Sequence, residues 1–180
     1  GQSPFLPPEH VMEALRGAAH RKEYTPVQGL LPLREAVADF HSTAHNITLH
    51  PDQVYIAPGS KALLYTIMLA FNNLEVLIPA PAWVSYAPQA ELCGHRALRI
   101  ATTFEERYRV TPANLAEALA ATDSRKPSLL VLNYPGNPEG LSYTRSELEA
   151  LTEVARQHKT WVISDEIYGL LDHQGRHTSL

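Results

Sequence analysis

The sequence is poor in several features that define common protein classes. Among its 180 residues Cys93 is the single cysteine, which excludes a disulfide framework and a cysteine-built metal cluster and fits a reducing cytoplasm. No apolar run approaches the roughly 20 residues of a membrane span, and no signal peptide opens the chain. The formal net charge of −4 gives no electrostatic basis for binding nucleic acid or an anionic membrane.

The remaining composition is typical of a globular domain. Hydrophobic residues make up 44% of the chain and charged residues 19%, so a core can be buried. The length suits one domain. The chain begins at Gly1 rather than at a methionine, and it stops at Leu180 just after a stretch rich in histidine and glycine. We therefore expect a piece of a longer protein.

Hydrophobic periodicity predicts two helices, over residues 9–21 and 32–44, followed by alternating strands and helices. The predicted strands are 54–57, 75–79, 96–102, 128–133 and 160–164, separated by helical patterns over 60–71, 81–92 (with a loop at its start), 111–121 and 144–158. Parallel strands need such crossover connections. The pattern predicts an α/β fold with a mostly parallel sheet and helices on both faces.

The segment Gly59-Ser60-Lys61 follows the first predicted strand and opens the next helix. Free backbone N–H groups at a helix start, with a glycine that allows close approach, form an anion site. A phosphate monoester would suit it, with the Ser60 hydroxyl as an extra donor. The alternative is an ordinary helix cap. A Walker motif is excluded, because its longer glycine-rich run is missing.

Two rigid loops follow later strands. Pro79 and Pro81 stiffen the backbone around Trp83, whose ring could stack on a planar ligand; a core tryptophan is the alternative. Residues 133–140 read Asn-Tyr-Pro-Gly-Asn-Pro-Glu-Gly, and Asn137 within them could donate its amide to a ligand oxygen. An ordinary loop rich in turn formers is the alternative there. An X-Pro bond in this loop is a candidate for the cis form.

The last predicted strand delivers Asp165, and Tyr168 follows three residues later. Ligands of open α/β sheets bind at the carboxyl ends of the strands. In a dry site, Asp165 could keep a heterocyclic nitrogen protonated by charge pairing, and Tyr168 could donate to an oxygen of the same ring. A strand ending in a polar turn is the alternative. With the phosphate cup, stacking ring and amide, the set is complementary to pyridoxal 5′-phosphate (PLP).

The ordered set of motifs resembles a known family. The chain is similar to the N-terminal half of the fold-type I PLP-dependent aminotransferases of class I and II, the group related to aspartate aminotransferases. The matching segments are residues 1–5, Tyr24 with Gly29, Leu33 and Arg34, Gly59-Ser60-Lys61, Pro81-Ala82-Trp83, Asn137–Gly140 and Asp165–Tyr168. The resemblance implies an N-terminal arm or interdomain segment with one helix over 1–26, and the first part of the PLP-binding large domain over 27–180.

The resemblance also implies roles for the residues that face the cofactor. Gly59, Ser60 and Lys61 would hold the phosphate, mainly through backbone amides. Trp83 would stack on the pyridine ring, and Asp165 would pair with the pyridinium nitrogen, which makes the ring an electron sink.

Other residues are implied to complete the site. Asn137 and Tyr168 would bond the ring hydroxyl. Tyr24 would reach the phosphate held by the neighbouring subunit, so the resemblance implies a homodimer. Gly1 would line the site for the substrate carboxylate.

The sequence departs from the family pattern at two points. Glu139 stands where the family usually has threonine. The lysine that forms the Schiff base with the cofactor, expected some tens of residues beyond Tyr168, is not in the chain. Lys61 is rejected as its substitute, because it belongs to the phosphate end. We therefore expect this chain alone to be inactive. The resemblance further implies cis peptide bonds before Pro81 and Pro138.

The predicted activity is PLP-dependent transfer of an amino group between an amino acid and a 2-oxo acid, in the cytoplasm. Two alternatives remain open: a β-lyase or synthase of the same fold, and the PLP-binding effector domain of a transcriptional regulator. No metal site is predicted, because the histidine pairs His41/His45 and His173/His177 lack a third ligand.

Overall fold

The computed structural model of the protein describes residues 4–173, 175 and 177–180. The chain divides into two compact units, Gly1–Ile56 and Ala57–Leu180. The first unit thus extends beyond residue 26, the predicted end of the N-terminal arm. The arm was predicted for the intact protein, and it stays a prediction. Among the described residues, no helix is both long enough and apolar enough to cross a membrane.

The first unit contains the helices α1 (Glu9–Ala18) and α2 (Leu31–His45) and the short 3-10 helix η1 (Pro51–Gln53). No residue of α1 is buried, whereas α2 buries Arg34 and Ala38. The Arg34 guanidinium donates to the Pro51 carbonyl at 2.9 Å and lies 3.4 Å from a carboxylate oxygen of Asp52. Arg34 therefore holds α2 against η1.

The strand predicted over residues 54–57 is wrong. All four residues are described, and none belongs to a strand. Val54 has an extended backbone, but its N–H group bonds back to Pro51, and the N–H group of Ile56 bonds to Gln28. The run therefore has no partner strand, because Val54 bonds back to η1 and Ile56 bonds to the loop at Gln28.

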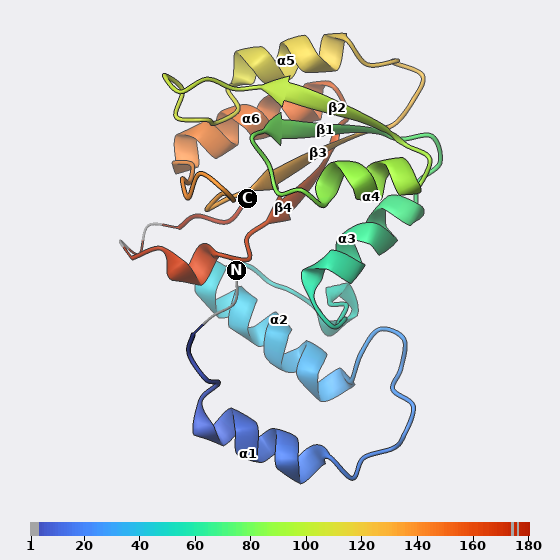
Figure 1. The fold of residues 1–180 in the computed structure, drawn as a ribbon, viewed down its shortest axis with the longest axis vertical. Coiled ribbons are helices and arrows are strands. Elements are labelled where there is room, and N and C mark those ends of the chain that lie inside the picture. The colour runs from blue at the N-terminus through green and yellow to red at the C-terminus, as the bar shows by residue number, and fades with distance from the viewer. Residues whose placement is uncertain (1–3, 174, 176) are drawn as a thin grey trace. The chain divides into compact units, whose positions relative to one another are not determined.

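The second unit is built on four parallel strands, β1 (Glu75–Ala80), β2 (Arg96–Ala101), β3 (Ser128–Asn133) and β4 (Trp161–Asp165). Their order in the sheet is β2-β1-β3-β4 (Figure 1). The register places Asn133 opposite Asp165, so the last residues of β3 and β4 are neighbours. The predicted parallel sheet is confirmed.

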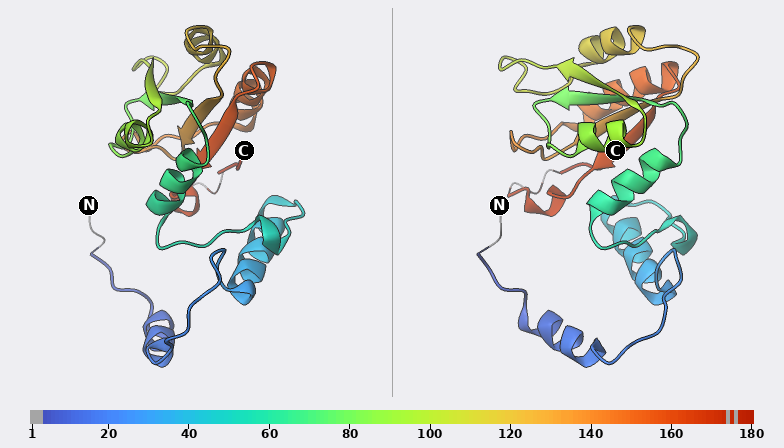
Figure 2. Two further views of the ribbon diagram at one scale, coloured as in Figure 1. Left: turned by 90° about the vertical axis from the view of Figure 1, so that its right-hand side faces the viewer. Right: turned by 45° about the vertical axis from the view of Figure 1, so that its right-hand side comes forward.

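Helices cover both faces of this sheet, as predicted (Figure 2). Alternate residues of each strand point to opposite faces. Leu77, Leu130 and Leu132 pack on the side of α5 (Pro112–Ala120) and α6 (Arg145–Gln157). Val76, Ile78, Leu129 and Val131 pack on the side of α3 (Ser60–Leu69) and α4 (Tyr86–Leu92). This two-sided packing explains why β1 and β3 are continuous apolar runs rather than alternating ones.

Local signals in the sequence place several helix starts. Thr111 and Thr144 form capping boxes with Asn114 and Glu147, at the predicted starts of α5 and α6. The peptide bonds before Pro81 and Pro138 are cis, as expected, and the bond before Pro135 is cis as well. A final 3-10 helix, η2 (Gly169–Leu171), follows β4.

Candidate functional site

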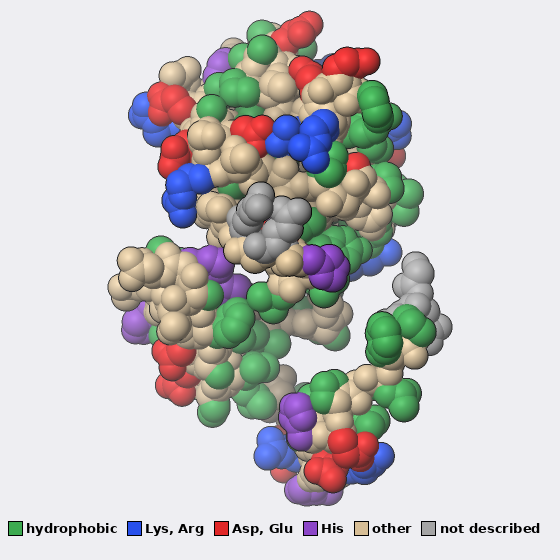
Figure 3. Space-filling model, turned by 90° about the vertical axis from the view of Figure 1, so that its left-hand side faces the viewer, with side chains coloured by type: hydrophobic (Ala, Val, Ile, Leu, Met, Phe, Trp, Pro, Cys, Tyr) green, Lys and Arg blue, Asp and Glu red, His purple; other side chains and the backbone are tan. Residues whose placement is uncertain are grey.

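The predicted site residues of the second unit gather at one edge of the sheet. Because the four strands are parallel, their carboxyl ends lie together, and the loops that follow β1, β3 and β4 meet there (Figure 1). Figure 3 looks onto this edge and shows Lys and Arg side chains on it beside acidic ones. Such an edge is where ligands of open α/β sheets bind.

Asp165 is the last residue of β4, and its side chain is held in a fixed place. The residue is 9% exposed, and the Tyr86 hydroxyl donates to its Oδ2 at 2.7 Å. Burial raises the pKa of Tyr86 above its usual range, and the hydrogen bond to Asp165 raises it further. The tyrosine therefore stays protonated and acts as a donor to the carboxylate.

Tyr86 is a site residue that the sequence did not reveal. It begins α4 and follows Trp83 by three residues, so the two rings meet edge to face with centroids 5.3 Å apart. The Lys61 ammonium lies 5.4 Å from the centroid of the Trp83 ring, within cation–π range. The structure thus connects Lys61, Trp83 and Asp165 through Tyr86.

The start of α3 has the features of an anion site. Gly59 has φ = +90°, a backbone conformation that residues other than glycine rarely adopt. None of the described side chains caps this helix. The N–H groups of the first turn, beginning with those of Ser60 and Lys61, are therefore available to bind a ligand. The Lys61 carbonyl accepts from the Gln89 side chain at 2.9 Å, which ties α3 to α4.

Asn133 anchors the loop that carries Asn137. Its side-chain oxygen accepts from the Asn137 N–H group at 2.9 Å, and its amide donates to the Asp165 carbonyl, also at 2.9 Å. The Tyr134 N–H group donates to the same carbonyl at 3.2 Å. Asn133 was predicted as the end of a strand rather than as a site residue. The sequence signal that could have identified Asn133 was a polar residue at the end of an apolar strand.

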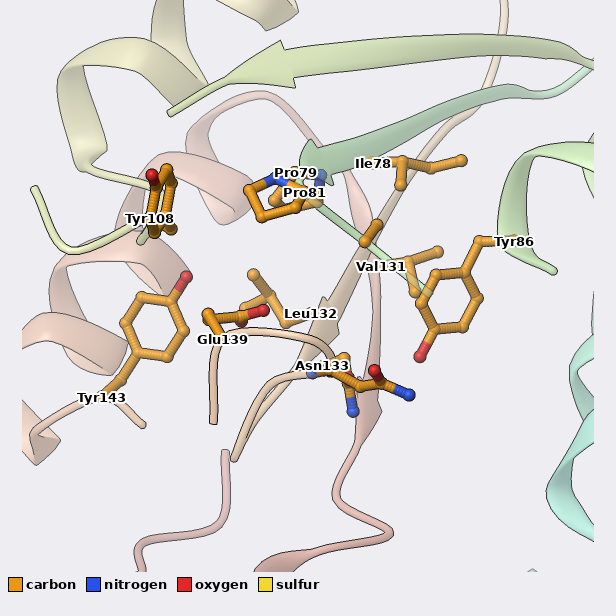
Figure 4. Close-up of a pocket in the computed structure, with 12 residues that line it drawn as sticks. Ile78, Pro79, Pro81, Tyr86, Tyr108, Val131, Leu132, Asn133, Glu139 and Tyr143 are labelled. Atoms are coloured by element: carbon orange, nitrogen blue, oxygen red, sulfur yellow. Dashed lines mark hydrogen bonds between the residues drawn. The ribbon is translucent and has the colours of Figure 1, made fainter. Parts of the chain in front are cut away.

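A small cavity of about 20 Å³ lies under this loop and the end of β1. It has room for about one water molecule, so a cofactor ring cannot occupy it. Tyr86 and Asn133 lie on one side of it and Glu139 and Tyr143 on the other (Figure 4). Burial raises the pKa of Glu139, whose Oε2 is buried without a hydrogen-bond partner among the described residues.

The remaining predicted residues fall in different places. Tyr168 is half-buried immediately before η2, three residues beyond Asp165. Its place after the carboxyl end of β4 keeps it a candidate for the same site. Tyr24 is fully exposed in the first unit. Gly1 lies outside the described residues.

Glu166, next to Asp165, receives several hydrogen bonds at once. Its carboxylate accepts from Ser164 at 2.5 Å, Ser179 at 2.9 Å and Tyr134 at 3.2 Å, and it lies 2.7 Å from His177 Nε2. Burial alone would raise the pKa of Glu166, but the hydrogen bonds from Ser164, His177 and Ser179 lower it overall. This network fixes the direction of the backbone immediately after Asp165.

Comparison with known proteins identifies the family. Residues 1–175 match the model of the family described as aminotransferase class I and II, and the chain belongs to this family. Aspartate aminotransferase of Bacillus subtilis (strain 168) is 34% identical over 100% of this chain and 46% of its own length. Aspartate/prephenate aminotransferase of Cereibacter sphaeroides is 35% identical over 93% of this chain and 42% of its own length. The chain thus spans less than half the length of these curated relatives.

Solved structures agree with this assignment. Aspartate aminotransferase of Thermus thermophilus with maleate superimposes with a TM-score of 0.91 at 33% identity, over 99% of this chain and 47% of that one. The aromatic aminotransferase of Pyrococcus horikoshii OT3 gives a TM-score of 0.90 at 31% identity, over 99% and 48%. The α/β fold is therefore that of the fold-type I PLP aminotransferases.

Members of this family use pyridoxal phosphate, and the residues at the carboxyl edge fit it. The uncapped start of α3 offers N–H donors for a phosphate. Trp83 offers a ring, and the buried Asp165 offers a carboxylate for a protonated nitrogen. These residues therefore match the phosphate, the ring and the protonated ring nitrogen of the cofactor.

Proposed function

We propose that the full-length protein carrying this chain is a PLP-dependent aminotransferase that moves an amino group between an amino acid and a 2-oxo acid. The observation that carries the proposal is Asp165, a buried carboxylate at the end of β4 that is held by Tyr86 at 2.7 Å. A carboxylate fixed in this way suits pairing with a protonated ring nitrogen. The printed names of the relatives, aspartate and aspartate/prephenate aminotransferases, favour the same reaction class.

The cofactor would be held at its two ends. Ser60 and Lys61 would bind the phosphate through backbone N–H groups, with the Ser60 hydroxyl as a further donor. Trp83 would stack on the ring, and Asp165 would hold the proton on the ring nitrogen. When bound, PLP supplies an electron sink for negative charge that develops on the substrate Cα.

The other predicted residues would orient the cofactor and the substrate. Asn137 and Tyr168 would donate to the ring hydroxyl, and Gly1 would line the substrate carboxylate site. Tyr24 would contact the phosphate bound by the partner subunit. The proposal therefore includes a homodimer that works in the cytoplasm on small amino and oxo acids, with residues 1–26 as arm and 27–180 as part of the large domain.

We place the Schiff-base lysine and the proton transfer outside these 180 residues. Lys61 is unsuited to that role, because its backbone lies in the first turn of α3 and its ammonium lies over Trp83. Borohydride reduction of the PLP-loaded full-length protein should label a lysine outside this chain. Stoichiometric labelling of Lys61 would contradict this placement.

The activity is tested by single-turnover reactions of the PLP-loaded full-length protein with a panel of amino acids. The expected product is the 2-oxo acid of the substrate, and Asp165→Asn should slow its formation by about 10²-fold or more, as loss of a charge aimed at the reacting system does. Absence of the oxo acid, or an unchanged rate in Asp165→Asn, would contradict the proposal. Release of ammonia with pyruvate would favour the β-lyase alternative.

A further inference from the structure

A second, larger cavity lies beside the loop that connects β3 to α6. It encloses about 530 Å³, a volume typical of sites for small molecules. Its lining includes Pro135, Gly140 and Ser142 of that loop. Among the described residues, Tyr143 is the one that this lining shares with the small cavity near Asn137. None of the residues proposed to hold PLP belongs to it.

Arginines are more numerous than acids among the described lining residues. Three arginines contribute to it: Arg107 and Arg109 from the segment before α5, and Arg145 from the start of α6. Asp172 is the one acid among the described lining residues, and the Glu147 carboxylate pairs with Arg109 beside them. A guanidinium offers several N–H donors in a planar fork that matches the oxygens of a phosphate.

Two of the three arginines keep their donors available. Arg109 is paired with Glu147 at 2.7 Å. Arg107 and Arg145 are exposed, and within the described part of the chain neither lies within 4.0 Å of a carboxylate oxygen. Their charges converge on the cavity from different segments of the chain.

We propose that this cavity binds a phosphate group, either as free phosphate or as part of a small phosphate monoester. The site is separate from the phosphate cup at Gly59-Ser60-Lys61, because its donors come from Arg107 and Arg145. The bound oxyanion accepts from the guanidinium groups of these two arginines.

The experiment is a calorimetric titration of full-length protein already saturated with PLP, which occupies the other phosphate cup. Inorganic phosphate is titrated first and glycerol phosphate second, at low ionic strength because screening weakens exposed charges. Arg107→Gln and Arg145→Gln should each weaken binding of at least one probe by about tenfold or more. Arg125→Gln is the matched control: Arg125 is exposed, pairs with Asp123 and does not line the cavity.

The titration separates the outcomes clearly. One bound probe per chain, weakened by both cavity variants and unchanged in Arg125→Gln, supports the site, and the probe bound more tightly identifies the source. No binding, binding insensitive to the cavity variants, or equal weakening by Arg125→Gln overturns it. PLP content, read from cofactor absorbance, is a separate measurement, so failure of the proposed aminotransferase function would not be mistaken for failure of this site.

Discussion

Asp165 and Tyr86 form a pair whose two members lie 79 positions apart in the chain. The carboxylate is nearly buried, and the phenol supplies its short hydrogen bond, at 2.7 Å. Burial makes an ionised group costly unless donors replace its lost water. The pair therefore serves both stability and the orientation of the carboxylate.

Replacement of Tyr86 by phenylalanine removes this donor and leaves the rest of the ring. Tyr86→Phe should lower the free energy of unfolding by about 1.5–3 kcal/mol, the typical value for a hydrogen bond to a charged group. Urea denaturation of the full-length protein measures the change. Tyr55→Phe, at a tyrosine that is 63% exposed, is the control and should change stability little. Equal stability of Tyr86→Phe and wild type would show that Asp165 does not depend on this donor.

Single residues also show how far the sequence can be interpreted. The sequence offers Ser60, Trp83, Asn137 and Asp165 as candidates because each lies in a loop or at an element end next to a recognisable strand. Tyr86 could not, since its role depends on a partner distant in sequence.

Glu166 illustrates the same limit, because its hydrogen bonds come from both ends of a chain segment that folds back on itself. It accepts from Ser164 within β4 and from Ser179 beyond η2. The sequence shows an acid beside Asp165 but gives no sign of these donors.

At the scale of elements, Thr144 defines the start of α6. Its hydroxyl accepts from the Glu147 N–H group, and the Glu147 carboxylate accepts from the Thr144 N–H group. Thr144→Ala should lower the free energy of unfolding by about 1 kcal/mol, because the Glu147 N–H group loses its acceptor. Thr152→Ala, on the exposed face of the same helix, makes the same chemical change without touching the cap. Thermal denaturation that ranks Thr152→Ala as the more harmful change would contradict the assignment.

The connection from β4 to residues 177–180 depends on the charge of Glu166. Its pKa is lowered in the folded protein, so its contribution to stability is fully present above the unfolded pKa of roughly 4.3 and is lost as the pH falls through the folded pKa. Glu166→Gln should therefore be less stable than wild type by roughly 1–2 kcal/mol at pH 7. The difference should shrink steadily below about pH 4.3.

Denaturation at a series of pH values measures this difference. Glu149→Gln, at an exposed carboxylate of α6, is the matched control and should give a small difference at every pH. A Glu166→Gln difference that stayed constant down to pH 3 would show that the loss of stability does not come from the charge of Glu166.

The elements themselves were largely predictable, with one informative exception. The runs that became β1 to β4 are each linked to the next by a helix, and this alternation indicates neighbouring parallel strands. Residues 54–57 show the same β-branched character, yet they join no strand, since Val54 bonds to η1 and Ile56 to Gln28. Local sequence indicates an extended backbone, but whether a partner strand is available depends on the tertiary fold.

On the scale of the whole molecule, the first unit has apolar side chains that its own helices leave exposed. Leu6 is 83% exposed, Leu15 73%, and Tyr24 and Val27 are fully exposed. Exposed apolar groups mark surfaces that a partner or another part of the full-length protein can cover. They support the proposed homodimer, in which Tyr24 serves the site of the partner subunit.

Mixing of two inactive variants tests whether Tyr24 acts across the dimer. Tyr24→Phe and Asp165→Asn are prepared as full-length proteins and are each expected to be nearly inactive. Equal amounts are dissociated and reassociated together, so about half of the dimers become hybrids by random pairing. If Tyr24 reaches the partner's cofactor, one site of each hybrid carries both substitutions and the other carries neither.

The mixture should then recover about one quarter of the wild-type activity, because one site in two is intact in half of the dimers. If Tyr24 instead served its own subunit, every hybrid site would carry one substitution, and activity would stay at the mean of the two parents. Subunit exchange is verified independently with an affinity tag on one variant. A tagged hybrid that forms without recovered activity would therefore exclude the shared site while leaving the dimer itself intact.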